Sequence, residues 1–133
     1  MKVSVIIPCF NEVNTVETLL NNVIKEKSCE KEIIVIDDFS TDGTRKILQN
    51  LNGIKYTKLI LNDTNRGKGY CIKKGIEKST GDIILIQDAD LEYSPTDYKI
   101  LTDPIKSGYA DVVFGSRFIG SQQKRVLFFW HTV

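Results

Sequence analysis

The sequence is poor in several residues on which common catalytic and structural sites depend. Its 133 residues include one histidine, His131, and three cysteines, Cys9, Cys29 and Cys71, without a CxxC pair. An odd number of widely spaced cysteines argues against a disulfide framework and against a zinc site. We therefore expect reduced thiols and a cytosolic setting, and we assign no role to His131.

Charge excess and long apolar runs are missing as well. Lysine and arginine number 18 and aspartate and glutamate 17, a net charge of +1 that gives no reason to expect a nucleic-acid partner. We expect no signal peptide, and no apolar run approaches the roughly 20 residues of a membrane helix. Repeats and low-complexity tracts are absent too. With 41% hydrophobic residues, the chain is expected to form one domain over residues 1–133.

Several motifs of nucleotide-binding and hydrolytic enzymes are also lacking. The sequence contains no GxxxxGK[ST] loop, no GxSxG elbow and no HExxH helix. The segment GKGYCIKKG offers Gly67 and Gly69, but its third glycine is Gly75, so the spacing of the dinucleotide fingerprint is not met. These absences exclude the P-loop, dinucleotide-binding, α/β-hydrolase and zinc-protease classes.

What is present is an alternation of buried strands with amphipathic helices. Apolar, β-branched runs predict strands over 2–8, 32–37, 54–61, 81–87 and 110–115. Helices are expected between them, the first opened by Asn14 with Glu17 as its capping-box partner, another by Ser94-Pro95, and a last one within RVLFFWHTV. This order predicts the α/β class, with a mostly parallel sheet flanked by helices.

The unusual residues follow the strands. PCFNE (8–12), DDFS (37–40), DADLE (88–92) and GSRF (115–118) each come where a predicted strand ends. Ligands of such sheets bind beyond the carboxyl ends of the strands. We therefore expect one cleft, lined by carboxylates and by Arg117.

The DAD segment carries the sharpest expectation. Two carboxylates about 5 Å apart repel by roughly 3 kcal/mol at an effective dielectric near 20, which a cation would offset. In an extended chain Asp88 and Asp90 point to one face, with Glu92 in reach, and oxygen ligands of this kind suit Mg²⁺ or Mn²⁺. The alternative is that Asp88 caps a turn and Asp90 is solvated.

Other charged residues have two readings each. Asp37 and Asp38 either form a turn or helix cap, or one of them accepts hydrogen bonds from a nucleobase. Arg66 and Lys68 are either solvated loop charges or face a phosphate. Arg117 either forms a surface ion pair or holds a diphosphate or an anionic acceptor by bidentate contacts.

Five segments together resemble the family 2 glycosyltransferases of the GT-A fold. They are VSVIIPCFNE, EIIVIDDFSTDGT, NRGKGYCIKKG, GDIILIQDADLEYSP and DVVFGSRF, which stand in the family's order between residues 3 and 118. Within the family the sequence looks most like the branch of dolichol-phosphate mannose synthases and polyprenyl-phosphate glycosyltransferases. The resemblance implies a Rossmann-like half that binds a GDP- or UDP-hexose through Mg²⁺ or Mn²⁺.

The resemblance also implies the roles of individual residues. Asp90 would be the principal metal ligand, joined by Asp88 and Glu92, and Asp90 and Arg117 would serve catalysis. The residues implied for nucleotide-sugar binding are Pro8, Phe10, Glu12, Ile36, Asp38, Lys68, Asp88, Ala89 and Asp90.

The implied reaction is inverting transfer of the hexose to a polyprenyl phosphate, at the cytoplasmic face of a membrane with which the chain associates peripherally. Family members continue well past GSRF, so we expect the acceptor-binding part to be missing and transfer by this chain alone to be poor. Two alternatives are transfer to a growing glycan (a polysaccharide or lipopolysaccharide) and a non-catalytic nucleotide-sugar-binding module. A phosphoacceptor receiver domain is disfavoured because its acidic pair follows the first strand, whereas Asp37-Asp38 follows the second.

Overall fold

A computed structural model describes residues 1–51, 57–115 and 127–131 of the chain. The strands are β1 (Val3–Cys9), β2 (Lys31–Asp37), β3 (Thr57–Leu61), β4 (Ile83–Ile86), β5 (Val112–Gly115) and β6 (Leu127–His131). The helices are α1 (Val16–Lys25), α2 (Thr44–Leu51), α3 (Lys68–Lys78), the short 3₁₀ helix η1 (Pro95–Asp97) and α4 (Tyr98–Lys106).

The described strands form one sheet in the order β3-β2-β1-β4-β6-β5. β3, β2, β1 and β4 run parallel to one another, while β6 pairs antiparallel with both β4 and β5. The connections between the parallel strands run through α1, α2 and α3, as right-handed βαβ units require. The predicted α/β class with a mostly parallel sheet is confirmed.

The register of the sheet brings the predicted site residues to one level. Cys9 at the end of β1 stands beside Asp37 at the end of β2. β4 ends earlier, where Ile86 stands beside Ile6, but its line continues because the Gln87 N–H donates to the carbonyl of Ile6 at 2.9 Å. The segment after Gln87 therefore runs alongside the segment that follows β1.

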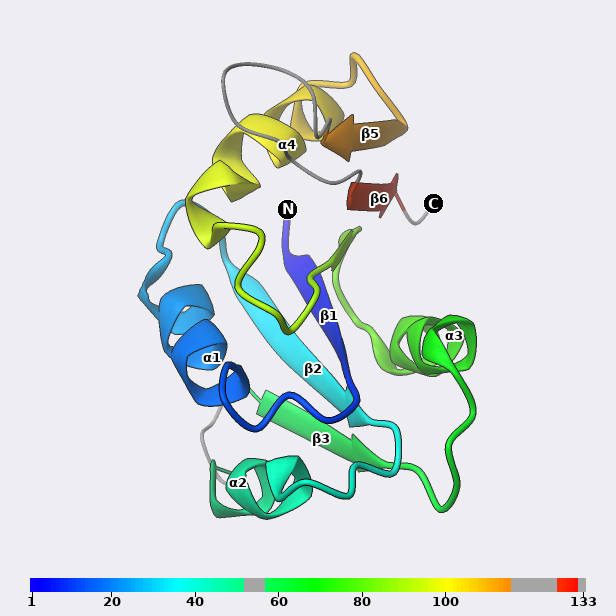
Figure 1. Ribbon diagram of the computed structural model, residues 1–133. Coiled ribbons are helices and arrows are strands. Elements are labelled where there is room, and N and C mark those ends of the chain that lie inside the picture. The colour runs from blue at the N-terminus through cyan, green and yellow to red at the C-terminus, as the bar shows by residue number, and fades with distance from the viewer. Residues whose placement is uncertain (52–56, 116–126, 132–133) are drawn as a thin grey trace.

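Both faces of the sheet are apolar and covered by helices. Successive residues of a strand point to opposite faces, so Val5 and Ile7 pack with α1, α2 and α4 while Ile6 packs with α3. Figure 1 shows α1 and α3 on opposite sides of the sheet. α3 lies close to the strands because Gly75 faces them: a Cβ atom there would come within 2.5 Å of Ile6 Cγ2. The continuous apolar runs seen in the sequence are explained by burial on both faces.

Two predicted details of the elements are wrong. The expected helix within RVLFFWHTV is strand β6, in keeping with the preference of aromatic residues for strands and with the open edge of β4. α1 begins one residue later than expected, after Thr15 and not Asn14, and Thr15 makes no side-chain cap hydrogen bond. The start at Ser94-Pro95 is confirmed, because the Ser94 side chain accepts from the Thr96 N–H.

Candidate functional site

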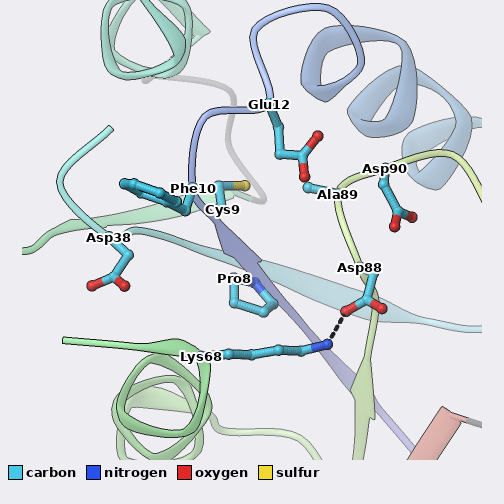
Figure 2. A pocket seen from close by; sticks show the side chains of 9 residues that line it. All are labelled: Pro8, Cys9, Phe10, Glu12, Asp38, Lys68, Asp88, Ala89 and Asp90. Carbon is cyan, nitrogen blue, oxygen red and sulfur yellow. Dashed lines mark hydrogen bonds and ion pairs between the residues drawn. The ribbon is translucent and has the colours of Figure 1, made fainter. Parts of the chain in front are cut away.

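The ends of β1, β2 and β4 and the start of α3 surround a cavity of about 280 Å³. It is shown in Figure 2 and lined by Pro8, Cys9, Phe10, Glu12, Asp38, Lys68, Asp88, Ala89 and Asp90. All of these except Cys9 belong to the set that the family resemblance implies for nucleotide-sugar binding. Ile36 of that set does not line the cavity, because its side chain is fully buried in the core beside α3. Arg117 lies outside the described residues.

The loop that follows β1 is attached to the loop that follows β2. Asn11 adopts a positive φ of 52°, and its Oδ1 accepts a hydrogen bond from the Thr41 N–H at 2.8 Å. The Glu12 N–H donates to Thr44 Oγ1 at 2.9 Å, at the start of α2. These bonds fix the backbone that directly follows Phe10, a residue that is 46% exposed. Phe10 thus presents an aromatic face at the rim of the cavity, as stacking on a flat ring requires.

Asp38 holds the start of α3 at the cavity. Its carboxylate accepts hydrogen bonds from the N–H groups of Arg66 and Gly67, both at 2.8 Å, and from Asn62 Nδ2 at 2.9 Å. Burial opposes ionisation of Asp38, but these hydrogen bonds outweigh it and lower the pKa of the carboxyl group. Asp38 therefore stays charged and fixes the backbone from which Lys68 extends.

Asp37 has a different environment from its neighbour. It is fully buried, and its Oδ2 lies 2.7 Å from Arg45 Nε and accepts from the Ser40 N–H at 3.2 Å. Arg45 also donates to the carbonyl of Asn62 at 2.6 Å, which ties α2 to the loop after β3. Of the two readings that the sequence left open for the pair, Asp37 takes the turn-forming one, and it does not line the cavity.

The DAD segment is bent and anchored at its centre. Thr15 Oγ1 donates a hydrogen bond to the carbonyl of Ala89 at 2.7 Å. The chain then turns through Leu91, which has a φ of 63°, and Asp90 Oδ1 accepts from the Glu92 N–H at 3.2 Å. The chain therefore does not stay extended as far as Glu92, which was the condition for that carboxylate to be in reach, and Glu92 is absent from the cavity lining. Asp88 and Asp90 nevertheless both line the cavity.

The two basic residues at the start of α3, Arg66 just before the helix and Lys68 at its first position, make different contacts. Arg66 is exposed, with its guanidinium 5.5 Å from the centre of the Tyr70 ring. Lys68 extends across the cavity and forms an ion pair with Asp88 Oδ1 (Figure 2). Of the described residues that line the cavity, Lys68 alone is positively charged, and it stands among four carboxylates.

The donor set fits a metal that is shared with a phosphate ligand. Among the described residues, no three histidine, cysteine, aspartate or glutamate side chains are grouped as a protein-only metal site. Mg²⁺ and Mn²⁺ accept carboxylate oxygens, and Mg²⁺ typically takes one or two protein carboxylates together with phosphates and water. Asp88 and Asp90 supply that number on one wall of the cavity. The part of Glu92 as a further ligand stays a prediction.

Two features of the site were not found from the sequence. Cys9 lines the cavity, but burial and then the nearby charge of Asp37 raise the pKa of its thiol well above the usual range, so it is neutral and not a nucleophile. Thr15 is not singled out by the sequence, which favours Asn14 as the residue that opens the first helix. Its actual acceptor, the Ala89 carbonyl, lies 74 residues away, and no local pattern signals such a contact.

Comparison with known proteins identifies the family. The model of the family named Glycosyl transferase family 2 matches residues 4–130. The chain belongs to this family. This family 2 glycosyltransferase is 34% identical over 120 residues to a dolichol-phosphate mannosyltransferase of Pyrococcus furiosus. The alignment covers 90% of this chain and 34% of the relative. The glycosyltransferase chain thus spans about a third of the length of that relative.

Solved structures agree with the family and the GT-A fold. TarS 1-349 of S. aureus in complex with UDP-GlcNAc matches with a TM-score of 0.72 and 30% identity, over 84% of this chain and 33% of that one. The mannosyltransferase PcManGT of Pyrobaculum calidifontis, in complex with GDP-Man and Mn²⁺, matches with a TM-score of 0.59 and 32% identity, over 66% and 27% of the two chains. Within the described part of the glycosyltransferase, no helix is long and apolar enough to cross a bilayer.

Proposed function

We propose that this chain is the donor-binding part of a metal-dependent, inverting glycosyltransferase that moves a hexose from a GDP- or UDP-sugar to a polyprenyl phosphate. The observation that carries the proposal is the meeting of Asp88 and Asp90 with Phe10 and Asp38 in one cavity at the carboxyl edge of the parallel sheet. A nucleotide sugar needs an aromatic or apolar surface for its base, an acceptor for the base N–H groups, and cations for its diphosphate. This cavity offers the first two directly. For the third it offers the ammonium of Lys68 and the carboxylates of Asp88 and Asp90, which can hold a divalent metal.

Each residue has a distinct task in this proposal. Phe10 stacks on the base and Asp38 accepts from a base N–H group, for which about one of the roughly four acceptor sites of the carboxylate is left beyond its three bonds to the chain. Asp88 and Asp90 hold Mg²⁺ or Mn²⁺. When bound, the metal supplies Lewis-acid stabilisation of the diphosphate leaving group. Arg117, assigned by its place in the GSRF segment, binds the diphosphate or the acceptor phosphate.

The acceptor is proposed from chemistry and from one relative. The relative from Pyrococcus furiosus carries the name of a transferase to dolichol phosphate. A phosphate acceptor is already an anion and needs no strong general base, whereas a carbohydrate hydroxyl would need one. A polyprenyl phosphate would place the enzyme at the cytoplasmic face of a membrane.

The donor site is tested first, by thermal shift with GDP, UDP and their sugars, each with and without Mn²⁺. Stabilisation that needs both Mn²⁺ and one nucleotide, and that is lost in Asp90→Asn, would support the site and identify the base. Asp63→Asn, an exposed carboxylate in the loop after β3, is the matched control. No stabilisation by any nucleotide would reject a working donor site in this chain.

The acceptor is tested separately, with labelled nucleotide sugar and either a polyprenyl phosphate or an oligosaccharide. Transfer to the lipid phosphate supports the proposal, and transfer to the oligosaccharide supports a glycan-extending enzyme. Donor binding without transfer to either would favour a nucleotide-sugar-binding module.

A further inference from the structure

We propose that Lys68 is an exchangeable counter-ion of the donor site, which competes with the divalent metal for Asp88 and moves to the diphosphate when metal and nucleotide bind. This inference rests on the proposed function and adds a coupling device to the same site. It starts from the ion pair between Lys68 Nζ and Asp88 Oδ1 across the cavity (Figure 2).

Asp88 is the fixed partner of the pair. Its side chain is 13% exposed, and its backbone carbonyl accepts a hydrogen bond from Gln87 Nε2 at 3.1 Å. Gln87 is itself fully buried, and its Oε1 accepts from the Tyr98 hydroxyl at 2.7 Å. The backbone that carries the carboxylate is therefore held by the core beneath it.

Lys68 is the movable partner. Its side chain is 56% exposed, and four methylene groups separate the ammonium from the backbone. The backbone at its root is fixed, because Asp38 accepts from the N–H groups of Arg66 and Gly67 immediately before it. The ammonium can therefore leave Asp88 at little cost, since a pair with one exposed partner is weak, but it stays within the cavity.

The charges of the cavity make such an exchange favourable. The lining carries four carboxylates and one lysine, and of the carboxylates Asp38 stays ionised and already accepts three hydrogen bonds from the chain. A divalent cation on Asp88 repels an ammonium on the same carboxyl group, while a diphosphate in the cavity attracts it. Metal binding thus releases Lys68 for the diphosphate, and the diphosphate draws Lys68 away and opens Asp88 to the metal. By linkage, each ligand strengthens the binding of the other to the same degree.

The test measures Mn²⁺ affinity directly, by electron paramagnetic resonance of free Mn²⁺, with and without GDP or UDP. In Lys68→Gln we expect the affinity for Mn²⁺ alone to rise about threefold to fivefold, because the competing cation is gone. The factor by which the nucleotide raises Mn²⁺ affinity should fall by at least about threefold, because the variant has no ammonium at this position to bind the diphosphate.

Two variants serve as controls. Lys73→Gln removes the same charge from an exposed position of α3 that does not line the cavity, and should leave Mn²⁺ affinity within about twofold. Lys68→Arg keeps a cation that pairs with carboxylates at least as well, so it should not raise Mn²⁺ affinity. Circular dichroism and melting temperature verify that all three variants are folded.

The outcomes separate this inference from the function on which it rests. Unchanged or weaker Mn²⁺ binding in Lys68→Gln, or an equal rise in Lys73→Gln, overturns the exchange while the donor site stands. Absence of Mn²⁺ binding by the unaltered chain, with either nucleotide present, overturns the donor site itself.

Discussion

The hydroxyl of Thr15 donates a hydrogen bond to the backbone carbonyl of Ala89, and the two oxygens are 2.7 Å apart. The bond joins the residue before α1 to the centre of the DAD segment, between the two carboxylates that line the cavity. Thr15 makes no side-chain cap hydrogen bond to its own helix, and of its hydroxyl contacts the one with Ala89 is shorter than the one with Glu12 Oε2, which is 3.1 Å away.

Replacing Thr15 by valine should loosen the DAD segment without unfolding the protein. Valine keeps the shape and leaves the Ala89 carbonyl without its donor, at a cost of about 1 kcal/mol in the free energy of unfolding. We expect affinity for Mn²⁺ with nucleotide to fall roughly threefold to tenfold, measured by calorimetry. The control is Thr18→Val, an exposed position on α1. Reduced stability with unchanged ligand affinity would show that the bond has only a structural role.

The close approach of α3 to the sheet predicts opposite effects for two glycines of that helix. Gly75→Ala places a Cβ atom 2.5 Å from Ile6 Cγ2 and 3.1 Å from Ile36 Cδ1, so the helix must shift. We expect a loss of about 1–3 kcal/mol from overpacking, partly offset by the better helix propensity of alanine. A Cβ atom added at Gly69 would have no other atom within 4 Å. Gly69→Ala should therefore be neutral or stabilise by up to about 1 kcal/mol. Urea unfolding of both variants decides the matter, and equal effects would contradict the packing argument.

The environment of the Glu32 carboxylate predicts how the free energy of unfolding depends on pH. The carboxylate lies in β2 away from the cavity, where Ser4 Oγ donates at 2.6 Å, the Thr80 N–H at 2.6 Å, and Lys58 Nζ lies 2.9 Å away. Burial would raise the pKa of Glu32, but these partners dominate and lower it from 4.5 to about 2. A lowered pKa means that the folded protein binds its proton less readily than the unfolded chain. The stabilisation is therefore complete above about pH 4.5 and is lost as the pH falls towards 2.

Glu32→Gln should cost roughly 1–3 kcal/mol at pH 7 and flatten the loss of stability between about pH 4.5 and 2. Denaturant unfolding at several pH values measures both effects. Glu30→Gln, an exposed neighbour, should reproduce the unaltered profile. A pH profile of Glu32→Gln parallel to that of the unaltered protein would refute the assignment.

Of the described strands, all but β6 could be predicted from the sequence for local reasons, whereas the residues of the cavity followed from the resemblance to the family 2 glycosyltransferases. β1 and β2 are short apolar runs that end in polar residues, and parallel strands place such ends at one edge. The failures have physical causes as well. The family resemblance implies Ile36 in the donor site, but period two turns its side chain into the core beside α3.

The amino-acid sequence by itself determined the α/β class, the parallel order of strands and helices, and which segments meet at the carboxyl edge, because these follow from hydrophobic period and chain order. Only the tertiary structure decided what each polar side chain does there. Asp38 anchors the start of α3, Thr15 holds Ala89, and Lys68 pairs with Asp88, and each contact joins residues 20 or more positions apart. Hydrogen-bond and ion-pair partners depend on distance in space, and the packing of helices on the sheet sets that distance.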